Sequence, residues 1–531
     1  KIMRKFKKKL FAAMLLLLAS SNAMATDNFT VNRTDFRDES IYFMITTRFY
    51  DGDPKNNVLC WDNQEAQMST KDPCWRGDFQ GVIDKLDYIK ALGFTAIWIT
   101  PVVQNASGYD YHGYHASDFS KVDCRYQSGD GKKSGDVMFQ ELIDKAHAKG
   151  IKIILDIVLN HTGNFGEEKL CKMFDRDTHL RNQAYIDACM IPDERKLGND
   201  YLGNVKIQYQ RRLALMKNTD GNNHDIHNYW HHTANNWNWD FPSRWMGQIA
   251  GDCVDLNTEN DYVAKYLVDC YGQFIKMGVD GFRIDTSGHI SRLTFNKEFI
   301  PQFEALGKQY ENKRLNKAPF FMYGEVCTRM NDVTYRGQAN LSCYFYTWKS
   351  DEALLNKWDG SKSYWDNQVI PEGSEPVGPQ LLCLEETTSP KSNNAKMLNG
   401  AWHEPDYSQS SGFNVIDFPM HYSYNTAQQA FSLASGDECY NDATFNVVYV
   451  DSHDYSPGPS DTNRFGGTDA QWAENLSLLF TFRGIPCLYY GSEVGFRRGV
   501  VIDKGPNGPL SNTGRAYFGG YITGDVEASD F

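Results

Sequence analysis

The sequence predicts an α/β protein built as a (β/α)8 (TIM) barrel, and three observations lead to this fold class. The chain has 531 residues, enough to bury the core of one large domain with substantial additions. Short apolar runs typical of buried strands alternate with amphipathic, helix-like segments, as in βαβ units with a parallel sheet. Eight such runs can be counted, so a barrel is the simplest architecture.

Each predicted element has its own local signal. A helix ends near Leu92 and is stopped by Gly93, residues 139–149 form an amphipathic helix stopped by Gly150, and residues 262–277 form another helix. The strands are continuous apolar stretches, as expected of strands covered on both faces. They are predicted at residues 41–46, 95–101, 151–158, 281–286, 320–326, 413–418, 446–451 and 485–490.

Two long irregular stretches interrupt the predicted barrel. Residues 162–254 are too many for an ordinary βα loop, so we expect an inserted domain after the third strand. The barrel then consists of residues 26–161 and 255–531, with an irregular insertion at about 328–411. Aromatic residues of the inserted domain fit sugar stacking and small-core packing equally well: Tyr229, Trp230, Trp237, Trp239 and Trp245.

Residues 1–25 are predicted to be a signal peptide. A basic stretch begins at Met3, an apolar run follows from Leu10 to Ala19, and Ala23 and Ala25 are small residues at the cleavage positions. The apolar run is too short to cross a bilayer as a stable helix. We therefore expect an exported protein, secreted or periplasmic, that is not attached to a membrane after cleavage.

Export makes disulfides possible among the 12 cysteines. Spacing cannot determine their connectivity, but two pairs flank polar loops and are the first candidates, Cys60 with Cys74 and Cys171 with Cys189. The cysteines in or beside apolar, strand-like stretches are expected to be buried free thiols: Cys253, Cys270, Cys327 and Cys487.

The charge balance narrows the classes of partner. The chain carries 54 basic and 67 acidic residues, a formal net charge of −13, and no Lys/Arg-rich run outside the extreme N-terminus. This composition argues against binding to nucleic acid or to an anionic membrane surface. Aromatic residues make up 14% of the chain, which suits stacking on flat, uncharged ligands, although a large core produces the same figure.

Arg283 and Asp285 form the most informative pair in the sequence. Residues two apart in a strand point to the same face, so both side chains should project together near the strand's C-terminal end. The guanidinium is then expected to hold Asp285 ionised and to lower its pKa, which suits a nucleophile. Taken alone, this pattern is more typical of an ordinary ion pair at a strand end.

Further acids and histidines follow other predicted strands. Glu325, Asp454, His161 and His453 all fall at or just after C-terminal strand ends, where barrel enzymes place their catalytic groups. Carboxylates that converge on one mouth raise each other's pKa, so at least one should stay protonated near neutral pH. One ionised and one protonated carboxylate are what retaining glycoside hydrolysis requires.

These residues lie within longer motifs, and through them the chain resembles the α-amylase family of glycoside hydrolases, family thirteen, from about residue 41 to 518. The motifs occur in the family's order and at strand ends. They are Asp156-Ile157-Val158-Leu159-Asn160-His161, Gly281-Phe282-Arg283-Ile284-Asp285, Gly324-Glu325-Val326 and Val450-Asp451-Ser452-His453-Asp454, with supporting matches at Tyr111-His112-Gly113-Tyr114, Asp252 to Asn257 and Gly484 to Glu493.

The resemblance implies a role for each site residue. Asp285 would be the nucleophile, Glu325 the general acid/base, and Asp454 the carboxylate that stabilises the oxocarbenium-like transition state. Arg283 would orient Asp285, and Tyr114 would stack beneath the sugar being cleaved. The remaining substrate-binding residues would be His112, His161 and His453.

The resemblance also implies calcium. Asn160, Asp255 and the backbone carbonyl of His289 match a structural calcium site between barrel and inserted domain. A second oxygen-rich cluster looks like a calcium site found in some members, although an Asx-rich turn gives the same composition. Its residues are Asp51, Asp53, Asn56, Asn57 and Asp78.

Two features depart from the family pattern. Gly288-His289 stands where many members have Lys-His, whose lysine contacts sugar beyond the cleavage point, so binding on the leaving-group side is expected to differ. The family's C-terminal β-sandwich has no counterpart, and the chain stops at Phe531 before a clear eighth helix, so we expect a truncated reading frame.

The expected function is that of a secreted, monomeric α-amylase that cleaves α-1,4-glucosidic bonds within starch- or glycogen-type glucans. The first alternative is a neopullulanase, a cyclomaltodextrinase or a transglycosylase like cyclodextrin glycosyltransferase, since water and a sugar hydroxyl compete for the same intermediate. A non-catalytic glucan-binding relative is a further alternative, disfavoured because all three carboxylates, Asp285, Glu325 and Asp454, are present.

Overall fold

The computed structural model describes most of the chain from residue 32 to residue 524. The predicted signal peptide, Trp237, Trp239 and three of the cysteines proposed to pair, Cys60, Cys171 and Cys189, lie outside the described residues. The described ranges are 32–58, 74–105, 110–163, 229–231, 243–250, 253–328, 339–357, 405–424, 426–454, 464–495, 504–505, 508–509 and 514–524.

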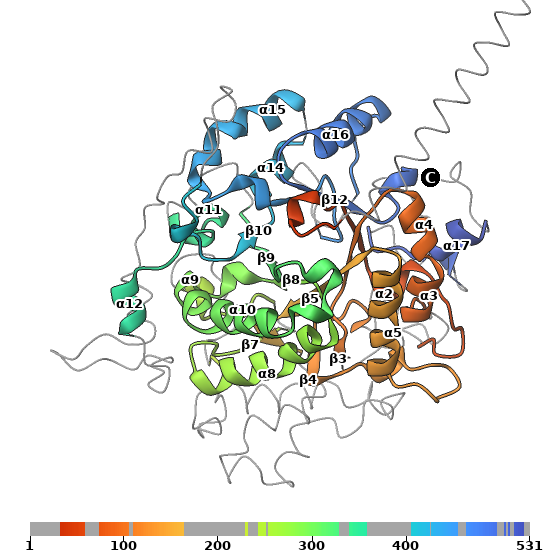
Figure 1. The fold of residues 1–531 in the computed structure, drawn as a ribbon. Helices are drawn as coiled ribbons and strands as arrows, with labels where there is room; N and C mark the ends of the chain where they lie inside the picture. The colour runs from red at the N-terminus through yellow and green to blue at the C-terminus, as the bar shows by residue number, and fades with distance from the viewer. Residues whose placement is uncertain are drawn as a thin grey trace, which may run out of the picture.

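Eight parallel strands form the barrel, in the order β10-β9-β8-β5-β2-β1-β12-β11 (Figure 1). The sheet closes because Ile416, directly after β10, bridges Val447 of β11 in parallel. Each strand lies within one of the eight predicted runs, which confirms the predicted fold class. The strands are β1 (Ile41–Met44), β2 (Ala96–Ile99), β5 (Lys152–Val158), β8 (Gly281–Asp285), β9 (Phe321–Gly324), β10 (Asn414–Val415), β11 (Val447–Val448) and β12 (Ile485–Tyr489).

β10 is shorter than the predicted strand at residues 413–418, and a helix start explains the difference. The Asp417 side chain accepts a hydrogen bond from the backbone N–H of Met420 and so caps α14 (Phe418–Ser423). Pro419 occupies the first turn, where its missing N–H costs nothing. Because Asp417 and Pro419 favour the start of a helix, the strand β10 ends earlier than predicted.

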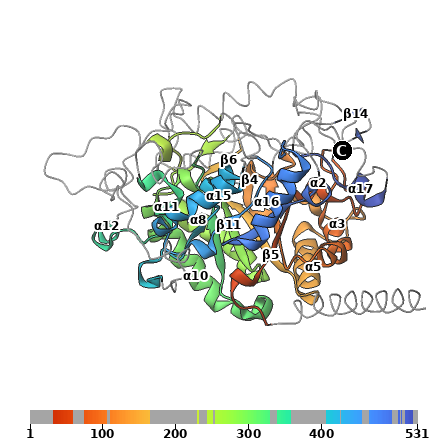
Figure 2. The same ribbon diagram turned by 90° about the horizontal axis from the view of Figure 1, so that it is seen from above.

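The longer helices alternate with the strands and cover the outside of the barrel (Figures 1 and 2). The predicted helices are confirmed, with α5 and α8 beginning slightly earlier than expected because Ser134 and Asn260 act as N-caps. Gly278 ends α8 in a left-handed conformation, φ 112°. These helices are α3 (Phe79–Asp84), α4 (Leu86–Ala91), α5 (Gly135–Ala148), α8 (Asp261–Met277), α10 (Ile300–Gln309) and α16 (Asp469–Thr481).

Shorter elements fill the connections. In chain order they are the helices η1 (Phe36–Asp38), α2 (Thr46–Phe49), η3 (Cys124–Tyr126), η6 (Ser243–Trp245), η7 (Ser287–His289), α9 (Arg292–Thr294), the π-helical η8 (Phe295–Phe299), η9 (Glu311–Lys313), η10 (Leu315–Lys317), η11 (Ala339–Leu341), α11 (Cys343–Tyr346), α12 (Glu352–Asn356), η13 (Tyr407–Gln409), α15 (Ala427–Ser432), η14 (Leu433–Cys439), η15 (Ala443–Phe445), η16 (Ser492–Val494) and α17 (Gly519–Thr523), and the ribbon of β13 (Lys504–Gly505) and β14 (Gly508–Pro509). Within the described part of the chain, no helix combines the length and apolar character needed to span a membrane.

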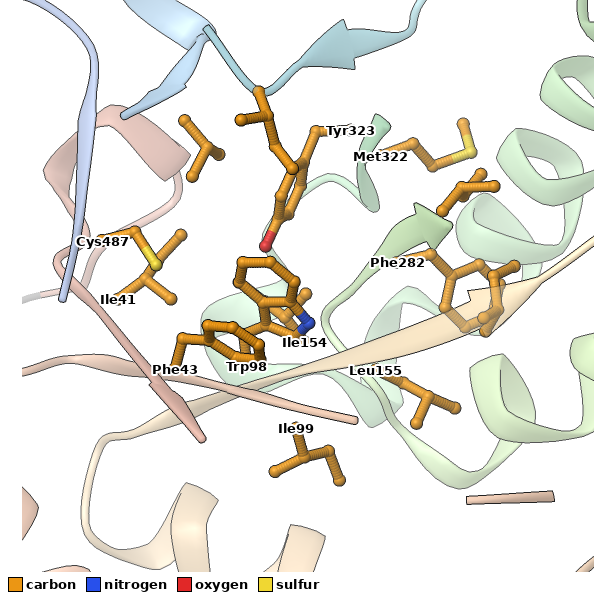
Figure 3. Packing of buried hydrophobic residues seen from close by; sticks show 14 of the residues in the cluster. Ile41, Phe43, Trp98, Ile99, Ile154, Leu155, Phe282, Met322, Tyr323 and Cys487 are labelled. Carbon is orange, nitrogen blue, oxygen red and sulfur yellow. The ribbon is translucent and has the colours of Figure 1, made fainter. Parts of the chain in front are cut away.

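Aromatic and aliphatic side chains pack together in the barrel core (Figure 3). Phe43 of β1 stacks on Trp98 of β2 with ring centroids 3.6 Å apart, and Tyr323 of β9 meets Trp98 edge-on at 5.8 Å. All three side chains are fully buried. These large, rigid rings restrict the movement of the polar residues that pack on them at the C-terminal end of the barrel.

Two antiparallel ribbons rise from the barrel. β6 (His161–Thr162) pairs with β7 (Val254–Asp255), so the segment predicted as the inserted domain begins and ends at one stem. The second ribbon, β3 (Val103–Asn105) with β4 (Ala116–Val122), frames residues 110–115. In the insert, Tyr229, Trp230 and Trp245 are buried, which favours core packing over sugar stacking for these three.

Buried thiols are found where apolar sequence predicted them. Cys253, Cys270, Cys327 and Cys487 are all buried. Cys74, the described member of the first candidate pair, is also buried.

Candidate active site

Asp285 and Glu325 lie side by side at the C-terminal end of the barrel. β8 and β9 are paired in register at Ile284 and Gly324, so the next residue of each strand is one of these two acids. Arg283 Nη1 donates to Asp285 Oδ1 at 2.8 Å, and its Nη2 donates to Glu325 Oε2 at 2.8 Å. One buried guanidinium therefore joins the two carboxylates, and Arg283 and Asp285 share a face as predicted.

Asp156 lies within β5, opposite Arg283 of β8, and holds this arrangement in place. It accepts hydrogen bonds from Arg283 Nη1 at 3.0 Å, from Trp98 Nε1 at 3.0 Å and from the Tyr114 hydroxyl at 2.9 Å. Asp156 belongs to one of the strand-end motifs, but its sequence context predicts no role for it. Its contacts make it the residue that orients both Arg283 and Tyr114.

Asp454 reaches the same end of the barrel from the segment after β11. Its Oδ2 lies 2.9 Å from His453 Nε2, and Arg515 Nη2 is paired with its Oδ1. Arg515 also donates to the His453 carbonyl at 3.1 Å. Sequence reasoning missed Arg515 because it stands in a polar stretch beyond the last predicted strand, where no pattern pointed to the site.

Tyr114 and the three histidines form an aromatic wall. The Tyr114 ring stacks on His453 with centroids 5.5 Å apart and planes at 10°, and His112 stacks on Tyr114 at 5.6 Å. His161 Nε2 lies 3.1 Å from the Tyr114 carbonyl oxygen. The structure thus brings together all the residues predicted to bind substrate.

The carboxylates have different pKa values because their neighbours differ. Burial, together with the charges of Asp285 and Asp454, raises the pKa of Glu325 to about 7 although Arg283 opposes the shift. Burial also raises the pKa of Asp454, but His453 and Arg515 outweigh it, so the net pKa lies well below the usual range. Glu325 is therefore suited to hold a proton near neutral pH, and Asp454 to remain ionised.

The expectation that the Asp285 pKa is lowered overall is wrong, although Arg283 does act in that direction. Burial outweighs the guanidinium, so the pKa of Asp285 is raised above its ordinary value. The prediction considered the neighbouring charge and left out desolvation of a side chain that is only 6% exposed. Asp285 still accepts a hydrogen bond from Arg283 and one from Thr286 Oγ1 at 3.1 Å. Both bonds favour the ionised form of Asp285.

Thr286 is held in an unfavourable backbone conformation beside both acids. Its φ of 46° is left-handed, which is rare for a β-branched residue. In this position its N–H donates to Glu325 Oε2 at 3.2 Å while its hydroxyl reaches Asp285. Strain of this kind persists where the surroundings enforce it, and here it coincides with the carboxylate pair.

The cluster around Asp51 fits a calcium ion. Among the described residues, three buried oxygens there have no hydrogen-bond partner: Asp51 Oδ1, Asn56 Oδ1 and Asn57 Oδ1. Asp78 draws the loop together, because it accepts from Asn56 Nδ2 at 3.0 Å and from the Asp53 N–H at 2.9 Å. Converging oxygens without donors are what Ca²⁺ takes as ligands.

The Asn160, Asp255 and His289 set fits calcium less well. Asn160 Nδ2 donates to Asp255 Oδ1 at 3.0 Å, and His231 Nδ1 lies 2.5 Å from Asp255 Oδ2. His231 Nε2 also lies 2.9 Å from Glu259. Both carboxylate oxygens of Asp255 thus already have hydrogen-bond partners, which leaves fewer lone pairs for a calcium ion.

A third group of possible ligands lies beside the aromatic wall. Ligand atoms of Asp110, His112 and His115 fall within 4.8 Å of one another. Asp110 Oδ1 and His115 Nδ1 are already paired at 2.6 Å, however, so these two groups satisfy each other.

Comparison with known proteins agrees with this geometry. A family model described as the catalytic domain of α-amylase matches residues 43–342, more than half of the chain. A β/α-amylase of Paenibacillus polymyxa is 28% identical over 485 residues, covering 89% of this chain and 29% of the relative. A cyclomaltodextrin glucanotransferase of Geobacillus stearothermophilus is 26% identical over 495 residues, covering 91% and 53%. The chain thus spans about half or less of these relatives' length.

Solved structures show the same fold. An Anoxybacillus α-amylase superposes with a TM-score of 0.52 at 21% identity, covering 87% of this chain and 72% of that one. The γ-cyclodextrin glucanotransferase of Bacillus clarkii gives a TM-score of 0.52 at 22% identity, covering 91% and 54%. With the family model matching over the strands that carry Arg283, Asp285 and Glu325, this chain belongs to the α-amylase family of glycoside hydrolases.

Proposed function

We propose that the chain is a retaining glycoside hydrolase that cleaves α-1,4-glucosidic bonds within starch- or glycogen-type glucans. The observation that carries the proposal is the pair of adjacent carboxylates joined by Arg283, one of which, Glu325, has a pKa raised to about 7. A proton donor and an ionisable nucleophile at one strand edge are what double displacement at an anomeric carbon needs.

In the first step, Asp285 attacks the anomeric carbon of the bound sugar while Glu325 gives its proton to the glycosidic oxygen. The carbon–oxygen bond breaks, the shortened glucan leaves with the proton, and a glycosyl ester forms on Asp285. In the second step, Glu325 takes a proton from water, whose oxygen displaces Asp285. Both carboxyl groups return to their starting states.

The other site residues prepare these steps. Asp454, kept ionised by His453 and Arg515, faces the positive charge that develops on the sugar ring. Tyr114 supplies an apolar ring for the sugar to stack on, fixed by its hydrogen bond to Asp156. His112, His161 and His453 offer ring nitrogens to sugar hydroxyls.

A transglycosylase of the cyclodextrin glucanotransferase type, or a neopullulanase or cyclomaltodextrinase, is the second candidate. The similarity to cyclomaltodextrin glucanotransferases over nine-tenths of the chain favours this alternative. The transglycosylase differs only in the second step, where a sugar hydroxyl replaces water, whereas the two hydrolases differ in the glucan that they bind. Gly288 supports altered binding on the leaving-group side, because no side chain projects from this position.

We further propose that the protein binds calcium and is exported. The three oxygens of Asp51, Asn56 and Asn57 that lack hydrogen-bond donors support calcium at the Asp51 cluster. Calcium would there tie the loop after β1 to the start of α3. The basic and apolar sequence of residues 1–25 supports export.

The deciding experiment follows products over time from soluble starch, pullulan and cyclodextrins, for the parent protein and Asp285→Asn. Mixed maltooligosaccharides that appear early from starch and vanish in the variant support an endo-acting amylase. Cyclic products from starch, or panose from pullulan, favour the second candidate. A folded, calcium-loaded parent that yields no product from any of the three glucans excludes the proposal.

A further inference from the structure

A cavity of 310 Å³ lies at the opposite end of the barrel from the carboxylates. Its walls come from segments that begin strands: Asn414 is the first residue of β10, and Asp442 and Phe445 precede β11. Tyr407, in η13, and Ser410 complete the rim. Because Glu325 and Asp454 follow their strands, this cavity is separate from the catalytic site.

Tyr407 presents a fixed aromatic surface at the cavity. The side chain is 52% exposed, yet its hydroxyl donates to Asp442 Oδ2 at 2.7 Å and its ring meets Phe445 edge-on at 6.5 Å. The Arg37 guanidinium also lies over the Phe445 ring, 4.4 Å from its centroid. An exposed ring fixed in this way can bind a flat apolar face at little cost in side-chain entropy.

The polar atoms at the cavity include both a donor and an acceptor. Asn414 uses its Nδ2 to donate to the Met322 carbonyl at 3.2 Å, and its Oδ1 has no partner among the described residues. Ser410 Oγ accepts from the Gly412 N–H at 3.1 Å, and its hydroxyl proton has no acceptor in the same set. Sugar hydroxyls both donate and accept, so they match this pair.

The charges at the cavity are already neutralised. Asp442 Oδ1 accepts from the Thr444 N–H at 3.0 Å and hydroxyl at 2.6 Å, and Arg37 Nη1 lies 3.9 Å from Asp442 Oδ2. The site therefore favours an uncharged ligand over an ion. A ring that carries hydroxyls on its edges and C–H bonds on its face fits the combination of Tyr407, Asn414 and Ser410.

We propose that this cavity is a second carbohydrate site, which binds a short stretch or an end of an α-glucan chain away from the catalytic carboxylates. A glucosyl ring stacks on Tyr407, and its hydroxyls bond Asn414 Oδ1 and the Ser410 hydroxyl. The volume lies at the small end of ligand pockets, which begin near 300 Å³. The identity of the ligand, though not the existence of the site, rests on the proposed function.

The test is electrophoresis of native protein through gels that contain glycogen. All proteins carry Asp285→Asn, so that the gel is not digested and binding at the catalytic site is the same throughout. Tyr407→Ala and Asn414→Ala are each expected to weaken binding to glycogen about five- to tenfold. Phe431→Ala is the matched control, because Phe431 is 53% exposed and lies outside the cavity.

Equal retardation of Tyr407→Ala, Asn414→Ala and Phe431→Ala would overturn the proposal, as would a parent that glycogen does not retard. A separate assay uses an intact Asp285 and maltotriose, which is too short to bridge both ends of the barrel. Tyr407→Ala should cleave maltotriose at the parent's rate. Failure of the parent to cleave any glucan would reject the proposed function, while the difference between gel variants would still decide the second site.

Discussion

The acids of the site differ from one another through their immediate neighbours. Glu325 shares Arg283 with Asp156 and Asp285, whereas Asp454 is paired with both His453 and Arg515. One guanidinium shared by three carboxylates cannot offset the rise in pKa that burial causes in all of them. Two partners beside one carboxylate can offset that rise. The division into one proton donor and one permanent anion is therefore built into the arrangement of cations.

This arrangement predicts the alkaline limb of the activity profile. Glu325 must be protonated to release the leaving group, and its pKa is raised to about 7. The active fraction is complete at lower pH and falls as the pH rises through that value, so kcat/KM should drop about tenfold per unit above it. Initial rates on maltoheptaose between pH 5 and 9 measure this limb; a flat profile up to pH 9 would contradict the assignment of Glu325 as acid.

The close approach of Arg244 to Gly288 predicts that a side chain at position 288 destabilises the protein. A Cβ at position 288 would lie 2.2 Å from Arg244 Nη2, and that buried guanidinium cannot easily move because it donates to the carbonyls of Leu341 at 3.0 Å and Cys327 at 3.2 Å. Gly288→Ala should therefore lower the free energy of unfolding by about 1–3 kcal/mol.

A double-mutant cycle identifies the cause. In an Arg244→Ala background the space above position 288 is empty, so the additional effect of Gly288→Ala should shrink to a few tenths of a kcal/mol (about 0.3–0.5). Urea unfolding of the parent, the two single variants and the double variant measures each change in the free energy of unfolding. Additive losses would show that some other neighbour excludes the side chain.

Local elements could be predicted from the sequence because their signals are local. Apolar runs placed all eight strands, and the two-residue period of a strand placed Arg283 and Asp285 on one face. The site needs contacts that no period reports: Tyr114 reaches Asp156 across 42 positions, and Arg515 reaches Asp454 across 61. Arg515 and the role of Asp156 were missed for this reason, and the Asp285 pKa was wrong because burial is a property of the assembled barrel.

The proposed calcium site at the Asp51 cluster lies in the loop between β1 and α3. Removing calcium with a chelator should lower the free energy of unfolding by about 3 kcal/mol if the ion is held at a hundred times its Kd. Burial raises the pKa of Asp78 to about 6, so the metal-free protein gains stability from protonated Asp78 at low pH and loses it as pH rises through that value. The effect of the chelator on Tm should therefore be larger at pH 7.5 than at pH 5.

Two variants assign the site. Asp51→Ala should abolish the response of Tm to calcium, because it removes one of the three oxygens that lack donors. Asp87→Ala, a change at an exposed aspartate of α4, should keep the response. An unchanged response in Asp51→Ala would move calcium to the Asn160 and Asp255 set.

At the scale of the whole molecule, one late segment fastens the barrel and completes the site together. The Phe518 N–H donates to the Arg48 carbonyl at 2.8 Å, and the Tyr490 hydroxyl donates to the Ala516 carbonyl at 2.7 Å. These bonds join the segment to α2, which follows β1, and to Tyr490, which directly follows β12. The same segment delivers Arg515 to Asp454. Stability and catalysis are thus linked through a stretch that local sequence patterns do not identify.

Two variants of this segment should separate its roles. Arg515→Met keeps most of the apolar stem and removes the charge, so Tm should change little while kcat/KM falls about ten- to a hundredfold. Without Arg515 the pKa of Asp454 rises, so the acid limb of the activity profile should move to higher pH. Tyr490→Phe removes the hydroxyl that bonds the Ala516 carbonyl and should lower Tm while leaving the profile in place. If Arg515→Met lowers Tm as much as Tyr490→Phe and leaves the acid limb unmoved, Arg515 serves the fold alone and Asp454 must owe its charge to His453.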